Sequence, residues 1–192
     1  MKPVPILIFI LIGLSLTGCA PSLVHYKAMG EAQKLDSAAS VIANATVQIN
    51  APAEIVWTCL MDVQAWPDWN PKVKSVQASG PLALGSKFTW GASFPRIESE
   101  VVYIRNEGEI VWVGRMLHVK AIHKWNLAVQ DNTTVVTTEE SLDGKMLSLF
   151  FGKKKLRSDL EAWLKYLKNQ AEAQYLGARE NAAFVSRPPR GL

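Results

Sequence analysis

Residues 49–71, INAPAEIVWTCLMDVQAWPDWNP, decide the fold because they join a strand, a helix and an irregular aromatic segment within one short stretch. The alternating residues 45–50 predict a short strand. The apolar run 53–61 then predicts a helix, and Pro52 at its start is tolerated because the first turn has no hydrogen bond to lose.

The rest of this stretch predicts a second, shorter helical turn in which Trp66 and Trp69 lie three residues apart. Pro67 and Pro71 limit how far any helix can run there. We expect the segment to cap one end of an internal chamber. One indole should pack inward and the other should lie at the chamber's mouth.

Six further segments predict strands, since they are rich in Val, Ile, Thr and aromatic residues and are separated by turn residues. They cover residues 72–78, 86–93, 97–105, 109–114, 117–130 and 133–142. Successive strands with short links predict an antiparallel meander.

The last long element, residues 148–173, has the spacing of an amphipathic helix. Its apolar positions recur at intervals of three and four: Leu156, Leu160, Trp163, Leu164, Leu167 and Ala171. Only a face of the sheet is large enough to cover such a stripe. The sequence therefore predicts an α+β domain: a curved antiparallel sheet of about six to seven strands wrapped round a long C-terminal helix, with two short helices after the first strand.

The order of these elements, with APAEIVW, WPDWNP, GSKFTW and TTEESLDG, resembles the START-like, helix-grip superfamily. More narrowly, it resembles the SRPBCC or polyketide cyclase/dehydrase-type proteins, which include birch-allergen-like members. The resemblance spans about residues 45 to 170. It implies an apolar cavity between sheet and helix that binds lipids, polyketides or other hydrophobic molecules, and catalysis in a minority of members.

The hairpin around Asp131 and Asn132 fixes which side chains share a face. With those two residues in the loop, Trp125 lies opposite Thr138 and His123 opposite Glu140, with Cβ atoms about 5 Å apart. The other face is more polar. His123, Trp125, Glu140 and Leu142 should therefore face the helix.

These residues and the remaining tryptophans form the predicted ligand site. Trp90, Trp112 and Trp163 each lie on an apolar strand or helix face, where ordinary core packing is the alternative role. The candidate ligand-binding residues are Trp66, Trp69, Trp90, Trp112, His123, Trp125, Glu140, Leu142 and Trp163.

His123 and Glu140 are also the candidate catalytic residues, as the acid-base pair of a cyclase, dehydrase or hydrolase-type enzyme. The alternative is that they satisfy each other as buried polar groups, or orient a ligand. No serine, cysteine or second carboxylate stands at a catalytic spacing from them. His25 and His118 lie elsewhere, so we expect neither a metal site nor a cofactor. Binding without catalysis is the preferred interpretation.

The N-terminus resembles a bacterial lipoprotein signal. Lys2 precedes the apolar run 6–16, and LTGC at 16–19 matches the lipobox pattern. The resemblance implies removal of residues 1–18 and lipid attachment to Cys19, so that the protein is exported and held at the cell envelope. Ala20 favours the periplasmic face of the outer membrane if the cell is Gram-negative. An ordinary signal peptide or an uncleaved anchor is the alternative.

The domain boundaries follow from these segments: a membrane tether at 19–44, the ligand-binding domain at 45–175 and a flexible basic tail at 176–192. Cys59 is expected to be a buried, inert thiol. The basic run 152–157 fits a solvated helix face or contact with anionic lipid head groups rather than a nucleic-acid site. The expected partners are a hydrophobic small molecule and a membrane, with oligomeric state open.

Overall fold

The computed structural model describes residues 22–92, 95–105, 107–145 and 147–185. Its strands are β1 (Val41–Ile49), β2 (Ser75–Ala78), β3 (Lys87–Gly91), β4 (Ile97–Arg105), β5 (Glu109–Met116), β6 (Val119–Gln130) and β7 (Thr133–Asp143). Its helices are α1 (Leu23–Glu31), α2 (Ala53–Met61), the 3-10 turn η1 (Val63–Ala65), α3 (Trp66–Trp69), α4 (Leu147–Phe150) and α5 (Lys153–Val185).

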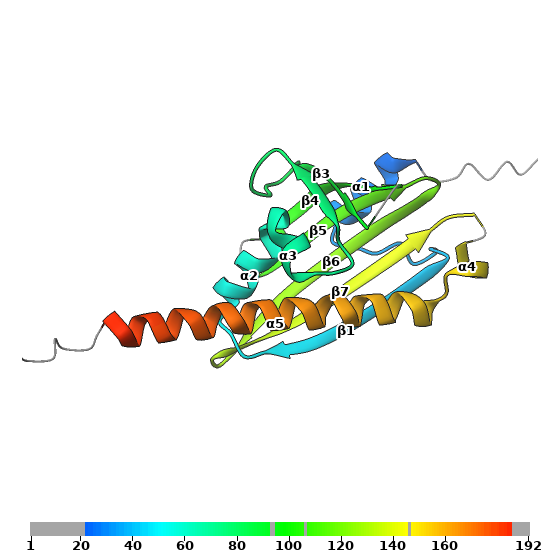
Figure 1. Cartoon of the computed structure of the whole chain (residues 1–192). Coiled ribbons are helices and arrows are strands. Elements are labelled where there is room, and N and C mark those ends of the chain that lie inside the picture. Colours follow the sequence, from blue (N-terminus) through cyan, green and yellow to red (C-terminus); the bar gives the residue numbers. More distant parts are fainter. Residues whose placement is uncertain (1–21, 93–94, 106, 146, 186–192) are drawn as a thin grey trace, which may run out of the picture.

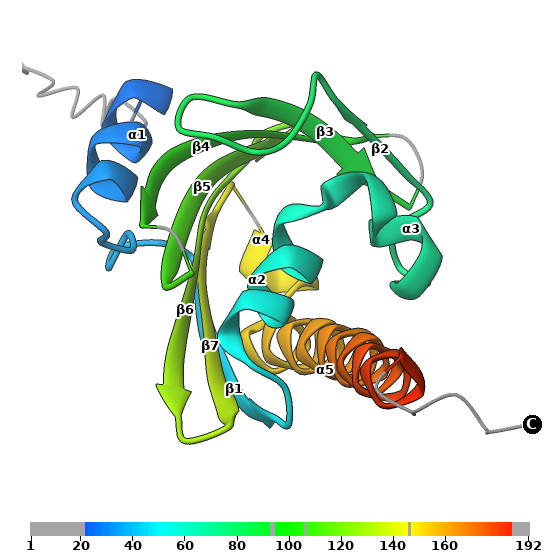
Figure 2. The same cartoon turned by 90° about the vertical axis from the view of Figure 1, so that its left-hand side faces the viewer.

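The seven strands form one antiparallel sheet in the order β1-β7-β6-β5-β4-β3-β2. The sheet curves around α2, α3 and α5, while α1 lies against its outer face (Figures 1 and 2). The predicted α+β architecture is confirmed, including the long C-terminal helix and the short helices after the first strand.

The register between β6 and β7 is the predicted one. Trp125 pairs with Thr138 and His123 with Glu140. The predicted strand 117–130 begins only at Val119, because Leu117 adopts a φ of 54° in the turn between β5 and β6.

The predicted helix at 148–173 is two helices, α4 and α5. The amide groups of Lys155 and Leu156 donate to the carbonyl of Gly152, which gives Gly152 the position of a helix N-cap. The apolar stripe of α5 is buried as expected. Helix α5 continues to Val185, so residues 176–185 of the predicted flexible tail are helical.

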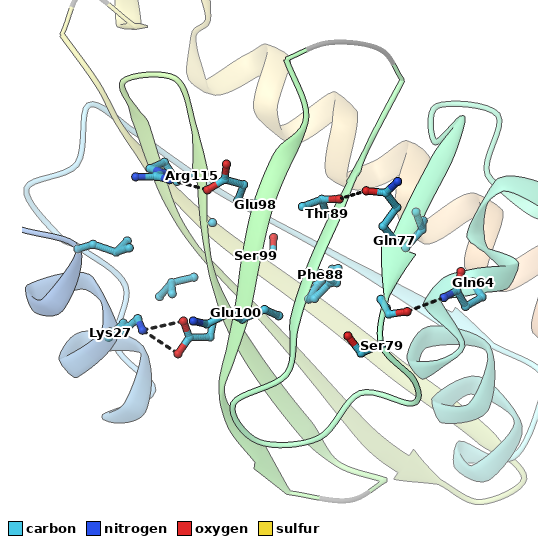
Figure 3. A pocket seen from close by; sticks show the side chains of 16 residues that line it. Lys27, Gln64, Gln77, Ser79, Phe88, Thr89, Glu98, Ser99, Glu100 and Arg115 are labelled. Carbon is cyan, nitrogen blue, oxygen red and sulfur yellow. Dashed lines mark hydrogen bonds and ion pairs between the residues drawn. The ribbon is translucent and has the colours of Figure 1, made fainter.

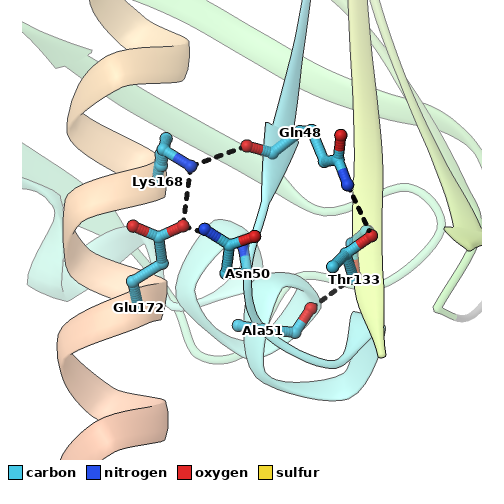
Figure 4. A network of polar contacts seen from close by, with 7 residues as sticks. Gln48, Asn50, Ala51, Thr133, Lys168 and Glu172 are labelled. Atoms are coloured by element: carbon cyan, nitrogen blue, oxygen red, sulfur yellow. Dashed lines mark hydrogen bonds and ion pairs between the residues drawn. The ribbon is translucent and has the colours of Figure 1, made fainter. Parts of the chain in front are cut away.

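A polar network fixes α5 to the end of β1 (Figure 4). Lys168 Nζ donates to the carbonyl of Gln48 at 2.7 Å and lies 2.6 Å from Glu172 Oε1. Glu172 in turn accepts the amide proton of Asn50 at 2.8 Å. Burial of Glu172 opposes ionisation, but these contacts outweigh it and lower the pKa of the carboxyl below its usual range.

Part of the predicted tether belongs to the domain. Strand β1 begins at Val41, and α1 packs on the outer face of β4, β5 and β6. Tyr26 is fully buried there and donates a hydrogen bond to Asp143 Oδ2 at 2.9 Å. Gly30 allows this approach because a Cβ atom on it would lie 2.7 Å from a methyl group of Val102. Residues 20–44 have no sustained apolar period from which such packing was predictable.

Candidate functional site

An aromatic cluster fills much of the space between the sheet and α5. Trp66 is fully buried at its centre, where its ring contacts Phe88, Trp90, Trp112 and Trp163 at centroid distances of 4.9–6.1 Å. Its Nε1–H donates to the carbonyl of Leu60 at 3.1 Å. The irregular WPDW segment thus supplies a central core residue.

A cavity of about 320 Å³ remains between this cluster, the sheet, α4 and the first turns of α5. Aromatic and aliphatic side chains from β3, β4, β5, β6, β7, α4 and α5, with Phe151 between the two helices, form most of its wall. Polar groups enter it at few places, chiefly at His123, Glu140 and Ser99. The apolar residues are Trp90, Ile97, Trp112, Met116, Val119, Ala121, Leu142, Leu147, Phe151, Leu156, Leu160 and Trp163.

Six of the nine candidate ligand-binding residues line this cavity: Trp90, Trp112, His123, Glu140, Leu142 and Trp163. The other three do not. Trp66 and Trp125 are fully buried behind the wall. Trp69 is half-buried and packs edge-on against Trp163 at 5.6 Å. One indole of the WPDW segment therefore packs inward, as expected, but neither of the two reaches the cavity.

His123 is buried and has both ring nitrogens facing polar groups. Its Nε2 lies 2.7 Å from Thr138 Oγ1. Because the Thr138 hydroxyl donates its proton to the carbonyl of Lys124 at 3.3 Å, it accepts from His123, which places the ring proton on Nε2. Nδ1 then directs a lone pair at Glu140 Oε1, 3.6 Å away and beyond hydrogen-bond range.

Burial sets the protonation of this pair. It lowers the pKa of His123 to about 3. Burial, with a smaller effect from the negative charge of Asp159, raises the pKa of Glu140 to about 8. Near pH 7 both groups are neutral, so their contact is not an ion pair. The cavity thus contains an uncharged carboxyl group that can donate a hydrogen bond.

Charged residues stand at the rim of the cavity, and the sequence did not reveal them. Lys72, just after the WPDW segment, pairs with Asp159 of α5 at 2.6 Å, and Lys155 binds the other oxygen of Asp159. Arg115 of β5 pairs with Glu98. Lys72 and Asp159 are 87 residues apart, so only the helix placement brings them together.

A larger hollow of about 790 Å³ lies outside the sheet, between α1 and η1 across β2–β5 (Figure 3). Most of the side chains labelled around it are polar or charged (Figure 3). Lys27 pairs there with Glu100 at 2.6 Å, and Gln64 donates to the carbonyl of Ala78. It lacks the aromatic wall of the inner cavity, so it is not the predicted chamber.

The described part of the chain contains neither a candidate metal site nor a membrane-spanning helix. No three His, Cys, Asp or Glu side chains in it come together as metal ligands would. None of its helices has both the length and the hydropathy needed to cross a membrane. The predicted lipidation site, Cys19, and the signal residues 1–18 lie outside the described residues.

The curved sheet, the helix it encloses and the apolar cavity between them define a helix-grip, START-like fold. The family model for polyketide cyclase/dehydrase and lipid transport proteins matches residues 40–172, and the chain belongs to this family.

Solved structures agree on the fold. A hypothetical protein from Helicobacter pylori is similar with a TM-score of 0.62 and 16% identity, over 70% of this chain and 90% of its own. A START superfamily protein from Mycobacterium smegmatis has a TM-score of 0.58 and 20% identity, over 69% of this chain and 98% of its own. The di-domain ARO/CYC protein BexL of the BE-7585A biosynthetic pathway has a TM-score of 0.54 and 18% identity, over 70% of this chain and 49% of its own. No protein with curated annotation matches the sequence.

Proposed function

We propose that this protein binds a small hydrophobic molecule in the cavity between the sheet and helices α4 and α5. The observation that carries the proposal is the cavity itself, about 320 Å³ with a mainly aromatic and aliphatic wall. This volume is at the small end of the roughly 300–1,000 Å³ typical of small-molecule sites. Apolar burial there supplies the affinity, since most of the wall is aromatic or aliphatic.

The polar groups narrow the class of ligand. The neutral Glu140 carboxyl donates to a hydrogen-bond acceptor, such as a carbonyl or ether oxygen. Lys72 and Arg115 also line the cavity, and each is paired with a carboxylate, of Asp159 and Glu98 respectively. A compact molecule with an aromatic or alicyclic body and an acceptor oxygen fits this arrangement.

Filling the cavity should abolish binding. Ala121 points into the cavity from β6, so Ala121→Phe places a ring in the ligand's volume. We expect the affinity for the neutral fluorophore N-phenyl-1-naphthylamine to fall at least about tenfold, or about 1.4 kcal/mol. Fluorescence titration measures this directly.

Ala128→Phe is the matched control, since it makes the same change on the same strand at an exposed position outside the cavity. Its affinity should stay within about twofold of the parent chain, a difference of only about 0.4 kcal/mol. Circular dichroism shows whether each variant is folded. Equal affinities in folded Ala121→Phe and the parent would contradict binding in this cavity.

A second candidate function is catalysis of the cyclase or dehydrase type. The protonated Glu140, facing the cavity, favours it because such a group is a general acid at neutral pH. His123 is less suited to act directly, since both nitrogens face protein groups. In an enzyme, Glu140→Gln would abolish turnover and keep binding, and in a carrier only binding would be observable.

The membrane location is also part of the proposal. Residues 16–19 match a lipobox, which supports lipid on Cys19, removal of residues 1–18 and attachment to the cell envelope. Cys19→Ser should prevent incorporation of labelled palmitate and release the protein from the membrane fraction. Unchanged palmitate incorporation would contradict lipidation at Cys19.

A further inference from the structure

Helix α1 fixes the end of the domain at which Ser22, the first described residue, lies. Leu23 and Arg115 line the same outer hollow, and a Cβ atom on Gly30 would contact Val102, Val113 and Val111 further along the sheet. Helix α1 therefore runs antiparallel to β5, and its N-terminus points to the end where β5 turns into β6 (Figure 1). Two residues separate Cys19 from Ser22, so the three steps between their Cα atoms span at most about 11 Å.

Helix α1 is fixed firmly to the sheet, so the position of Cys19 would limit the orientation of the whole domain. Tyr26 is fully buried against the sheet and binds Asp143, and Lys27 pairs with Glu100. A lipid on Cys19 would hold the same end of the domain close to the bilayer, because the short linker cannot extend past it. The opposite end, at the turn between β6 and β7, lies far from this attachment (Figure 1).

Three of the exposed large apolar side chains lie at this end of the domain. Leu117 at the β5–β6 turn and Leu149 on α4 are 67% and 68% exposed, and Val24 of α1 is 73% exposed. Leu117 also has a φ of 54°, a conformation that costs energy in a leucine and would suit glycine or asparagine better. A large apolar residue kept exposed in such a turn indicates a contact with an apolar environment.

Basic residues lie at the same end of the domain, next to α4. Lys145, Lys153 and Lys154 are exposed near α4, and none has an acidic partner within 4.0 Å among the described residues. The nearby acidic residue Asp159 is already paired with Lys72 and Lys155. Exposed apolar side chains next to lysines without acidic partners complement an anionic bilayer, where lysines bind head groups and leucines enter the acyl region.

The cavity reaches the same end of the domain. Met116 and Val119 on either side of the β5–β6 turn, with Leu147 and Phe151 around α4, line it and are partly exposed. Gly144 packs against Val119, so the turn and the start of α4 adjoin each other. A molecule leaving between them would pass directly beside Leu117 and Leu149.

We propose that this docking end, formed by Val24, Leu117, Lys145, Leu149, Lys153 and Lys154, rests on an anionic phospholipid bilayer with the cavity mouth facing the lipid. The ligand then passes between bilayer and cavity without crossing water. The proposal rests on the proposed attachment through Cys19 and adds the orientation that the attachment imposes.

Site-directed fluorescence tests the orientation in the full chain. Leu117→Cys and Leu149→Cys, labelled with nitrobenzoxadiazole, report the near end; Val129→Cys and Leu176→Cys report the far end and are similarly exposed in the parent chain. Cys59 does not interfere, because burial raises its pKa to about 11 and its side chain is almost inaccessible. The parent chain gives the background labelling.

In vesicles of phosphatidylcholine and phosphatidylglycerol, we expect emission at positions 117 and 149 to rise severalfold and to be quenched by nitroxide lipids. Positions 129 and 176 should remain unchanged. Lys153→Glu with Lys154→Glu should reduce the signal at position 117, whereas Lys165→Glu, exposed further along α5, should not.

Equal signals at all four positions, or a larger signal at 129 and 176, would overturn the orientation while leaving the attachment intact. A full chain that does not float with vesicles would overturn the attachment and the orientation together. Ligand binding is independent of both results, because the Ala121→Phe titration measures it without vesicles.

Discussion

Trp66→Ala should destabilise the domain by about 3–5 kcal/mol, the range for removing a large buried aromatic side chain. Trp66 is fully buried and contacts four aromatic rings, three of which belong to Trp90, Trp112 and Trp163 in the cavity wall. Its loss also leaves the Leu60 carbonyl without its indole donor. Urea denaturation followed by circular dichroism measures the change.

Trp69→Ala is the matched control within the same segment. Trp69 is half-buried and has one aromatic contact, with Trp163, so its removal should cost only about 1 kcal/mol. Similar losses of stability in the two variants would contradict the distinct positions of the two indoles. A folded Trp66→Ala protein should also bind larger ligands, since the wall behind the cavity becomes thinner.

The free energy of unfolding should fall by about 2 kcal/mol between pH 6.5 and 8 because of Glu140. Its folded-state pKa of about 8 lies above the unfolded value of 4.5. Between these values the folded state holds a proton that the unfolded state has released. Stability is therefore lost as the pH rises towards the folded pKa.

His123 changes the free energy of unfolding in the opposite direction, over a lower pH range. Its folded pKa of about 3 lies below the unfolded 6.5, so the unfolded state binds the extra proton and stability rises with pH between them. From pH 4.5 to 6.5 the two effects offset each other. Above about pH 7.5 the unfolded-state histidine has lost its proton, so only Glu140 of this pair still changes stability there.

Glu140→Gln removes the titration and keeps the shape, so the alkaline decline should disappear in this variant. Urea midpoints measured every half pH unit from 5.5 to 8.5 would show it. Glu139→Gln is the control, as it makes the same change one residue earlier on the other face of β7. An alkaline decline that persists unchanged in Glu140→Gln would show that Glu140 is ionised in the folded protein near pH 7.

Alternation and turn position were sufficient to predict the sheet and the β6–β7 register, because a slip of one residue would place Lys124 and Glu139 in the core. The same rule placed His123 and Glu140 beside each other. It could not predict that Trp66 would occupy the centre of the aromatic cluster behind the cavity wall. That outcome depends on how the WPDW turn directs its side chains, which no period in the sequence encodes.

Hydrophobic periodicity also could not predict contacts between segments that are far apart in the sequence. The Lys72–Asp159 pair at the rim requires the angle of α5 relative to the sheet. The packing of α1 depends on a single glycine, Gly30, in a segment with weak amphipathicity. Local periodicity predicts helices and strands and the side of each that is buried. Contacts such as the Lys72–Asp159 pair depend on how complete helices and strands pack together.

The position of Trp66 limits the length of any molecule that the protein can accept. Between the curved sheet and α5, this indole and its ring contacts fill the part next to α2 and α3. The bound molecule can occupy only the part next to α4. A single side chain in an irregular turn thereby selects compact ligands over long-chain ones, independently of the polarity of the cavity.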